Sequence, residues 1–126
     1  MNMRLFAIRG AVCADNTPES ITEATDDMCR RIFTSNNIQP ADIVSIQFSI
    51  TPDLDALNPA AALRHSSCAS IVSSCALFCA AEPVVKNMLP RVIRVMVNAY
   101  MDENASVRHV YIRGAEVLRP DFSGAR

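Results

Sequence analysis

The spacing of apolar and polar residues predicts a strand followed by a long helix in the first part of the chain. Residues 5–12 form a short, mostly apolar run that is typical of a strand. Between residues 21 and 33, apolar side chains recur at intervals of three and four, which predicts an amphipathic helix of about 16 residues. Thr17 is suited to cap this helix and Pro18 to occupy its first turn. The polar residues 35–37 are expected to end it.

The rest of the chain predicts further strands. Residues 43–50 alternate in the manner of a strand, and residues 91–99 are so rich in β-branched side chains that we expect a strand buried on both faces. Residues 107–112 and 115–118 are expected to be two closing strands, with Gly114 at the turn between them.

Two short segments predict helices, and one segment fits either kind of element. Helices are expected at residues 59–64, from Pro59 to Arg64, and at residues 82–88, from Glu82-Pro83 to Met88. Residues 66–81 remain open at this stage: Ile71-Val72 favours a strand, whereas the alanine and cysteine content permits a helix.

Length and composition fit one globular domain. The chain has 126 residues, of which half are hydrophobic and a fifth are charged. That is enough to bury a core, and it excludes a wholly disordered chain. Strands and helices alternate and strands then follow in a run, which predicts an α+β (mixed α/β) domain over residues 1–126, with a flexible tail at about 122–126. The net charge of −1 excludes the basic footprint of a nucleic-acid-binding protein.

The cysteines favour reduced thiols over a metal site or disulfides. There are five, no CxxC motif occurs, and only His65 and His109 are available as histidine ligands. We therefore expect no metal and a cytoplasmic protein. Arg9 interrupts what would be the apolar region of a signal peptide, and the apolar stretch 69–81 is too short to cross a bilayer.

Three charged residues stand in apolar surroundings. Arg9 interrupts the first predicted strand, Arg94 lies between Ile93 and Val95, and Glu82 follows an apolar run. A buried ion is costly unless it is paired, so each is either part of a structural ion pair or a ligand contact. Glu82 is a possible partner of Arg94, and the second arginine then leaves surplus positive charge that would suit an anionic ligand.

The familiar catalytic motifs are missing from the sequence. It has no GxSxG, Walker, GxGxxG or HExxH motif. Eleven of its twelve basic residues are arginines, whose planar side chains pair with carboxylates in a bidentate manner. A site lined by arginines, without an evident base or nucleophile, points to catalysis by positioning and electrostatic stabilisation.

Several short motifs occur in the order and spacing of one family. They are Ile8-Arg9-Gly10-Ala11, Thr51-Pro52-Asp53-Leu54, Pro59-Ala60 with Arg64, Cys79-x-x-Glu82, Pro90-Arg91-Val92-Ile93-Arg94-Val95, Arg108-His109-Val110-Tyr111 and Leu118-Arg119-Pro120-Asp121. The chain thus resembles the barrel-type, trimeric chorismate mutases, as distinct from the all-helical class, over residues 4–122.

The resemblance implies both a fold and an activity. The fold would be a homotrimer built around a pseudo-barrel of mixed β-sheet, with helices packed outside and active sites between subunits. The reaction would be the Claisen rearrangement of chorismate to prephenate in aromatic amino acid biosynthesis, without a cofactor or a metal.

The resemblance also implies roles for particular residues. Arg94 would be the cation beside the ether oxygen, and Arg9 and Tyr111 would hold a substrate carboxylate. Glu82 and the thiol or backbone of Cys79 would contact the ring hydroxyl and the ring. The remaining substrate contacts implied by the resemblance are Arg64 and Arg119 near the mouth of the site, together with Phe78, Ala80, Ala81 and Leu118.

Departures from the family pattern keep two other functions open. Asn58 stands where an aromatic residue is usual, Ala61 where a basic residue is frequent, and Phe78 where a smaller residue is common. Ala81 replaces a frequent glutamine, and about three extra residues lie between Arg64 and Cys79. The alternatives are a trimeric protein that binds a small carboxylate without turnover and an imine-hydrolysing trimer of similar shape.

Overall fold

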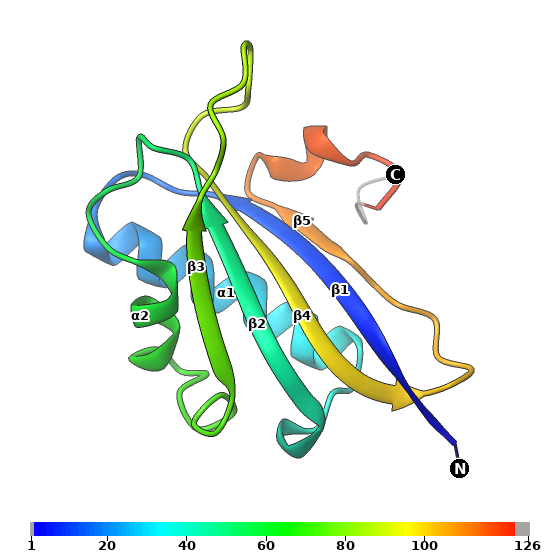
Figure 1. The fold of residues 1–126 in the computed structure, drawn as a ribbon. Coiled ribbons are helices and arrows are strands. Elements are labelled where there is room, and N and C mark those ends of the chain that lie inside the picture. The colour runs from blue at the N-terminus through cyan, green and yellow to red at the C-terminus, as the bar shows by residue number, and fades with distance from the viewer. Residues whose placement is uncertain (1, 123–126) are drawn as a thin grey trace.

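The computed structural model describes residues 2–122, which form a mixed five-stranded sheet with helices on one of its faces (Figure 1). In chain order the elements are β1 (Met3–Cys13), α1 (Pro18–Ser35), the 3₁₀ turn η1 (Pro40–Asp42), β2 (Ile43–Ile50), α2 (Pro59–Arg64), β3 (Ala76–Ala81), β4 (Val92–Asp102), β5 (Val110–Ile112) and the 3₁₀ turn η2 (Ala115–Leu118). The α+β class expected from the sequence is confirmed.

The strands lie in the order β3-β2-β4-β1-β5. The central strand β4 is antiparallel to both of its neighbours, β1 and β2. The two outer strands, β3 and β5, are each parallel to the strand beside them. This order places residues from both ends of the chain next to one another, because β1 pairs with β5, the strand at one edge of the sheet (Figure 1).

Helix α1 forms as its sequence predicts. Thr17 caps it by accepting the backbone N–H of Ser20 at 3.1 Å, and Pro18 occupies its first turn. Its apolar stripe, which includes Ile21, Met28 and Ile32, is fully buried against the sheet. Helix α2 also has the predicted bounds, and Asn58 caps it by accepting the N–H of Ala60 at 2.8 Å.

The core lies between the helices and one face of the sheet. On β4 the side chains of Ile93, Val95 and Val97 point into it and are almost completely buried. The alternate positions Met96 and Tyr100 are 39% and 45% exposed. The expectation that this strand is buried on both faces is therefore wrong for the single chain, because no described element covers most of the second face.

We call this second face the open face. Its exposed apolar members include Leu5, Phe78, Met96 and Tyr100, which lie on neighbouring strands at alternate positions. At one end, next to β5, the turn η2 and the residues after it cover part of the face. There they form a small second cluster of Ala11, Val92, Tyr111, Ala115, Leu118 and Phe122.

The predicted helix at residues 82–88 is wrong. The N–H of Glu82 donates to the carbonyl of Ile50 at 2.7 Å, so the chain continues the ladder beyond β3 instead of turning into a helix. Beyond Pro83 the segment is an exposed loop, in which Asn87 has a positive φ of 65°. Figure 1 shows this loop projecting beyond the sheet between β3 and β4.

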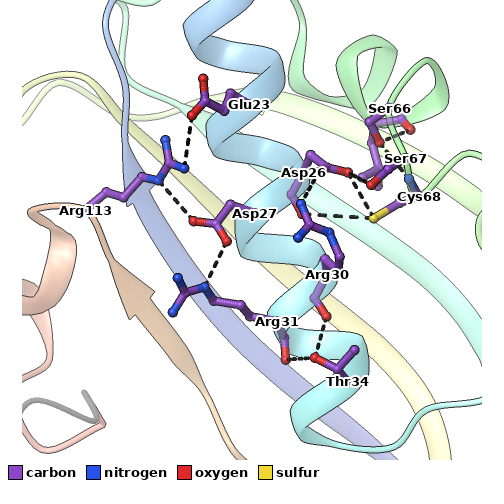
Figure 2. Close-up of polar contacts among 11 residues, drawn as sticks. Glu23, Asp26, Asp27, Arg30, Arg31, Thr34, Ser66, Ser67, Cys68 and Arg113 are labelled. Atoms are coloured by element: carbon purple, nitrogen blue, oxygen red, sulfur yellow. Dashed lines mark hydrogen bonds and ion pairs between the residues drawn. The ribbon is translucent and has the colours of Figure 1, made fainter.

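The segment at residues 66–81 divides into two parts. Residues 66–75 form consecutive turns, and β3 follows at residues 76–81. Asp26 of α1 holds the turns in place: its carboxylate accepts hydrogen bonds from Ser67 and from the Cys68 thiol, and it pairs with Arg30 (Figure 2). Burial raises the pKa of Cys68 to about 11, so this group is a neutral thiol that donates to Asp26.

The end of the chain differs from its predicted pair of strands. β5 is limited to Val110–Ile112, and residues 115–118 form the 3₁₀ turn η2 instead of a strand. Gly114 adopts a φ of 97°, and its N–H is bonded to the side chain of Glu116 at 2.7 Å, which closes a tight turn. Residues 123–126, where we predict a flexible tail, lie outside the described residues.

Within residues 2–122, no helix is both long and apolar enough to cross a bilayer.

Candidate active site

Three of the predicted site residues line one cavity on the open face. Arg9 comes from β1, Arg94 from β4 and Tyr111 from β5. The cavity has a volume of about 390 Å³. These residues are far apart in sequence, and the strand order β4-β1-β5 brings them together.

Glu82 and Arg94 form an ion pair beside this cavity. The Arg94 Nε lies 3.1 Å from Glu82 Oε1, and the hydroxyl of Ser49 on β2 donates to the same carboxylate oxygen. The Glu82 side chain is only 16% exposed, against 36% for Arg94. The pairing anticipated from the sequence is thus present, and Arg9 remains as a second positive charge in the cavity wall. These three residues together carry a net positive charge, which suits an anionic ligand.

The position of Arg9 depends on the close packing at Gly10. A Cβ placed on Gly10 would lie 2.9 Å from the carbonyl oxygen of Val110 and 3.0 Å from Ile32 Cδ1. Glycine therefore allows β5 and α1 to approach β1 closely. Next to it, the backbone N–H of Arg9 donates to Nδ1 of His109 at 2.9 Å.

Residues near the C-terminus surround Tyr111. Tyr111 is only 3% exposed and packs in the second cluster with Leu118 and Phe122. Arg119 lies with its guanidinium carbon 3.7 Å from the centre of the Phe122 ring and pairs with Asp121 at 2.7 Å. The structure thus places Leu118 and Arg119 on the same side of the sheet as Tyr111.

The predicted residues of β3 point to both faces. Phe78 pairs with Gln47 and Ala80 with Ser49, both on the open face, and Phe78 is 62% exposed. The side chain of Cys79 packs against the core. Burial raises the pKa of its thiol, which is therefore neutral at physiological pH. Ala81 ends the strand opposite Ile50.

Arg64 does not reach the cavity in the single chain. It ends α2, which packs against α1 on the helix-covered side of the sheet. The cavity lies on the open face. Of the predicted contacts, Arg64 is thus on the other side of the sheet from Arg9 and Arg94.

Several residues that line the cavity were not predicted from the sequence. They are Gly10, Gln47, Phe48, Ser49, Val95, Met96 and Asn98. Asn98 donates to Gln47 Oε1 at 2.8 Å and to Ser45 Oγ at 3.0 Å, so these polar side chains form a row on the open face. The alternation of residues 45, 47 and 49 with the buried Ile46 and Phe48 was the signal that separates the two faces.

The site has the groups needed to bind a carboxylate and to stabilise a developing negative charge. Two guanidiniums and a phenol can donate to anionic oxygens, and the Glu82 carboxylate can accept from a hydroxyl. Among residues 2–122, no group of three or more histidine, cysteine, aspartate or glutamate side chains is placed to hold a metal ion.

Comparison with known proteins places the chain in a family. The model of the family "Chorismate mutase type I" matches residues 5–122. The chorismate mutase AroH of Bacillus subtilis (strain 168) is 37% identical over 123 residues, which cover 96% of this chain and 94% of that protein. Chorismate mutase AroH of Thermus thermophilus is 37% identical over 122 residues, or 94% of this chain and 97% of that protein.

A solved structure agrees with this similarity. A chorismate mutase from Clostridium thermocellum has 38% sequence identity and superimposes with a TM-score of 0.81, covering 89% of this chain and 98% of that one. The fold is therefore that of the chorismate-mutase-like pseudo-barrel. Because the family model and its relatives cover nearly the whole chain, the protein belongs to the type I chorismate mutases, a family of isomerases.

Proposed function

We propose that this protein rearranges chorismate to prephenate in the cavity on the open face, with Arg94 as the main catalytic cation. The observation that carries the proposal is the cavity itself. In a chain of this family, Arg9, Arg94 and Tyr111 line one cavity, and Glu82 is paired with Arg94.

The chemistry follows from where charge develops. In the Claisen rearrangement the C–O ether bond breaks ahead of C–C bond formation, so the ether oxygen becomes more negative on the way to the transition state. A cation fixed beside this oxygen stabilises the transition state more than the substrate. The ion pair with Glu82 holds the Arg94 side chain in one orientation, so little reorganisation is needed during the reaction.

The other residues hold the substrate in its reactive conformation. Arg9 and Tyr111 bind a carboxylate of the folded substrate. Glu82 and the backbone of Cys79 contact the ring hydroxyl. The thiol of Cys79 does not take this role, because it packs against the core. Arg64 and Arg119 attract the second carboxylate at the mouth of the site.

A millionfold acceleration of the reaction requires a barrier lower by about 8 kcal/mol, which one desolvated cation and conformational restriction together can supply.

The same proposal includes a homotrimer with active sites between subunits. The open face exposes Leu5, Phe78, Met96 and Tyr100, and a second copy would cover them. An interface would also explain why Arg64 is separated from Arg9 and Arg94, since a neighbouring subunit would supply it.

We further propose one domain over the whole chain, a role in aromatic amino acid biosynthesis and a cytoplasmic location, which suits the five free thiols.

The direct test is the loss of chorismate absorbance when purified protein is mixed with chorismate, together with identification of prephenate as the product. We expect turnover without added metal or cofactor. Saturable binding of chorismate without its loss would overturn the proposal in favour of a carboxylate-binding protein. Hydrolysis of an imine substrate with no effect on chorismate would favour the imine-hydrolysing alternative.

A further inference from the structure

His109 completes the pairing of β1 with β5 through its side chain. The backbone ladder between these strands begins at Gly10 and Val110 and continues to Val12 and Ile112. One residue before it, the N–H of Arg9 is bonded to Nδ1 of the His109 imidazole at 2.9 Å. A ring nitrogen thus takes the place of a backbone carbonyl at the residue that lines the cavity.

This hydrogen bond requires a neutral imidazole. Nδ1 accepts only when it carries no proton, so the ring proton must be on Nε2. Protonation would replace the acceptor with a second donor facing the Arg9 N–H. It would also add a positive charge beside the Arg9 side chain.

The same ring also contacts the C-terminal segment. The His109 and Phe122 rings lie 4.3 Å apart between centres, and Phe122 is also 6.1 Å from the Tyr111 ring. Arg119 lies over the same Phe122 ring. His109 and Phe122 therefore link Arg9, Tyr111 and Arg119, which come from three separate segments of the chain.

Burial and the neighbouring positive charges favour the neutral form of His109. Burial has the largest effect and lowers the pKa of His109 below its usual value of 6.5, and the positive charges of Arg9 on β1 and Arg119 after η2 lower it further. The hydrogen bond with the Arg9 backbone and the negative charge of Asp121 are smaller influences that raise it. Because the Arg9 N–H is the donor and Nδ1 the acceptor, however, this bond itself needs the neutral ring. Arg31 of α1 and Arg108 also border the hollow of about 540 Å³ that is lined in part by His109.

We propose that His109 is a positioning residue, which fixes the backbone of Arg9 for binding the substrate carboxylate and makes that binding sensitive to acid. The proposal rests on the function proposed above. It predicts that KM rises as the pH falls and the imidazole gains a proton, whereas kcat changes less, because the carboxylate is bound in the substrate as well as in the transition state.

The kinetic test compares His109→Asn with His109→Leu. The asparagine Oδ1 occupies a position like that of Nδ1 and accepts without titrating, whereas leucine accepts no hydrogen bond. Near pH 7.5 we expect KM to rise about tenfold in His109→Leu and to stay within about threefold of wild type in His109→Asn, as for one lost hydrogen bond. As the pH falls below 6.5, KM should rise in the wild type and stay flatter in His109→Asn.

The matched control is His65→Asn. This substitution changes the other histidine of the chain, which follows α2 on the helix-covered side and lies outside the cavity. It should keep the acid dependence of the wild type. Equal KM values for His109→Asn and His109→Leu at neutral pH would overturn the proposal.

A second measurement needs no substrate. Hydrogen exchange of the Arg9 amide, followed by NMR on the intact protein, should be faster in His109→Leu than in wild type and restored in His109→Asn. If His109→Leu folds poorly, the wild-type protein alone tests the proposal: the NMR chemical shift of the Arg9 amide should change with pH together with the signals of the His109 ring. An amide shift that stays constant through the ring's titration contradicts the proposal. Absence of chorismate turnover in wild type would instead refute the proposed function and leave these amide measurements valid.

Discussion

At the residue scale, the proposed chemistry rests on two arginines and one carboxylate. The sequence marks Arg9, Arg94 and Glu82 because charges are costly in apolar strands. The structure shows that Glu82 neutralises one arginine, while the other lies in the same cavity wall. The sequence allowed these charged residues to be either a structural ion pair or a ligand site. In the folded chain Arg94 fits both, because it pairs with Glu82 and lines the cavity.

Replacing Arg94 should affect turnover far more than substrate capture. Its charge is expected to face an oxygen that becomes negative only as the bond breaks, so its interaction strengthens in the transition state. We expect Arg94→Gln to lower kcat by about 10³-fold, equivalent to about 4 kcal/mol, with a much smaller change in KM. Steady-state kinetics with chorismate would measure both parameters.

Arg91→Gln is a matched control for this substitution. Arg91 stands just before the same strand and pairs with Asp15 at 3.5 Å, at an exposed position outside the cavity. This variant should retain wild-type kcat. A folded Arg94→Gln protein with more than about a tenth of the wild-type kcat would show that another group carries the reaction.

The rate should change little between about pH 7 and pH 9. Arginine side chains stay charged throughout this range. Burial raises the pKa of Cys79 above 9.0, so the neutral thiol predominates over this range and little thiolate forms to repel the substrate carboxylates. The measurement is the pH profile of kcat/KM. A bell-shaped profile centred near neutrality would instead indicate general acid–base catalysis.

At the scale of the elements, side chains at their ends decide several bounds. Both helices begin at prolines, as the sequence predicts, and Thr17 caps α1 as expected. Asn58 departs from the family pattern, and its side chain has a structural role as the cap of α2. The predicted helix at residues 82–88 fails because the N–H of Glu82 bonds to β2, a partner that local patterning does not reveal.

The turns at residues 66–75 should depend on Asp26. Its carboxylate binds Ser67, Cys68 and Arg30 (Figure 2), so Asp26→Ala removes three partners and leaves the Cys68 thiol without its acceptor. We expect the free energy of unfolding to fall by about 1–3 kcal/mol, measured by urea denaturation. Asp42→Ala, in the 3₁₀ turn before β2, is the control and should change it by less than about 0.5 kcal/mol.

This contribution of Asp26 should also depend on pH. Burial by itself would raise the Asp26 pKa, but the hydrogen bonds from Ser67, Arg30 and Cys68 lower it overall below 3.8. The stabilisation is thus complete well above pH 3.8 and is lost as the pH falls through the lower pKa of the folded state. A difference between wild type and Asp26→Ala that stayed constant down to pH 2 would contradict this origin.

At the scale of the whole molecule, the open face leaves several large apolar side chains exposed in the single chain. Leu5 on β1 and Tyr100 on β4 are opposite one another and are 48% and 45% exposed. Burial of such side chains between subunits contributes about 25 cal/mol per Å² of apolar area. We therefore expect a trimer in solution, measured by sedimentation equilibrium of the purified protein.

Leu5→Glu should shift this trimer towards monomers, because three carboxylates would be desolvated at the interfaces. Activity should fall with the loss of the trimer at low protein concentration. Ser70→Glu adds the same charge to an exposed turn on the helix-covered side and should leave the assembly intact. A fully active monomer of the wild-type protein would refute interfacial active sites.

Much of the fold could be predicted from the sequence because it depends on local periodicity. The stripe of α1 and the alternation in β2 reflect geometric repeats of 3.6 and two residues. The catalytic candidates were found from charges in apolar strands and from motifs in family order. The prediction of a closing strand at residues 115–118 was wrong. The positive φ of Gly114 and its bond to Glu116 form a turn there, and apolar content does not predict such a turn.

Local sequence patterns were enough to predict the mixed class, the long helix with its N-cap, and which charged residues interrupt the strands. The strand order that unites Arg9, Arg94 and Tyr111, the separation of Arg64 from them, and the bond from the Arg9 backbone to His109 were evident only in the folded chain. The difference lies in the sequence separation of the interacting residues. Helical repeats and caps involve neighbours within a few residues. Strand order and the bond between Arg9 and His109 join residues about one hundred positions apart. Contacts at such a separation compete with many alternative pairings of the chain, so local patterning does not predict them.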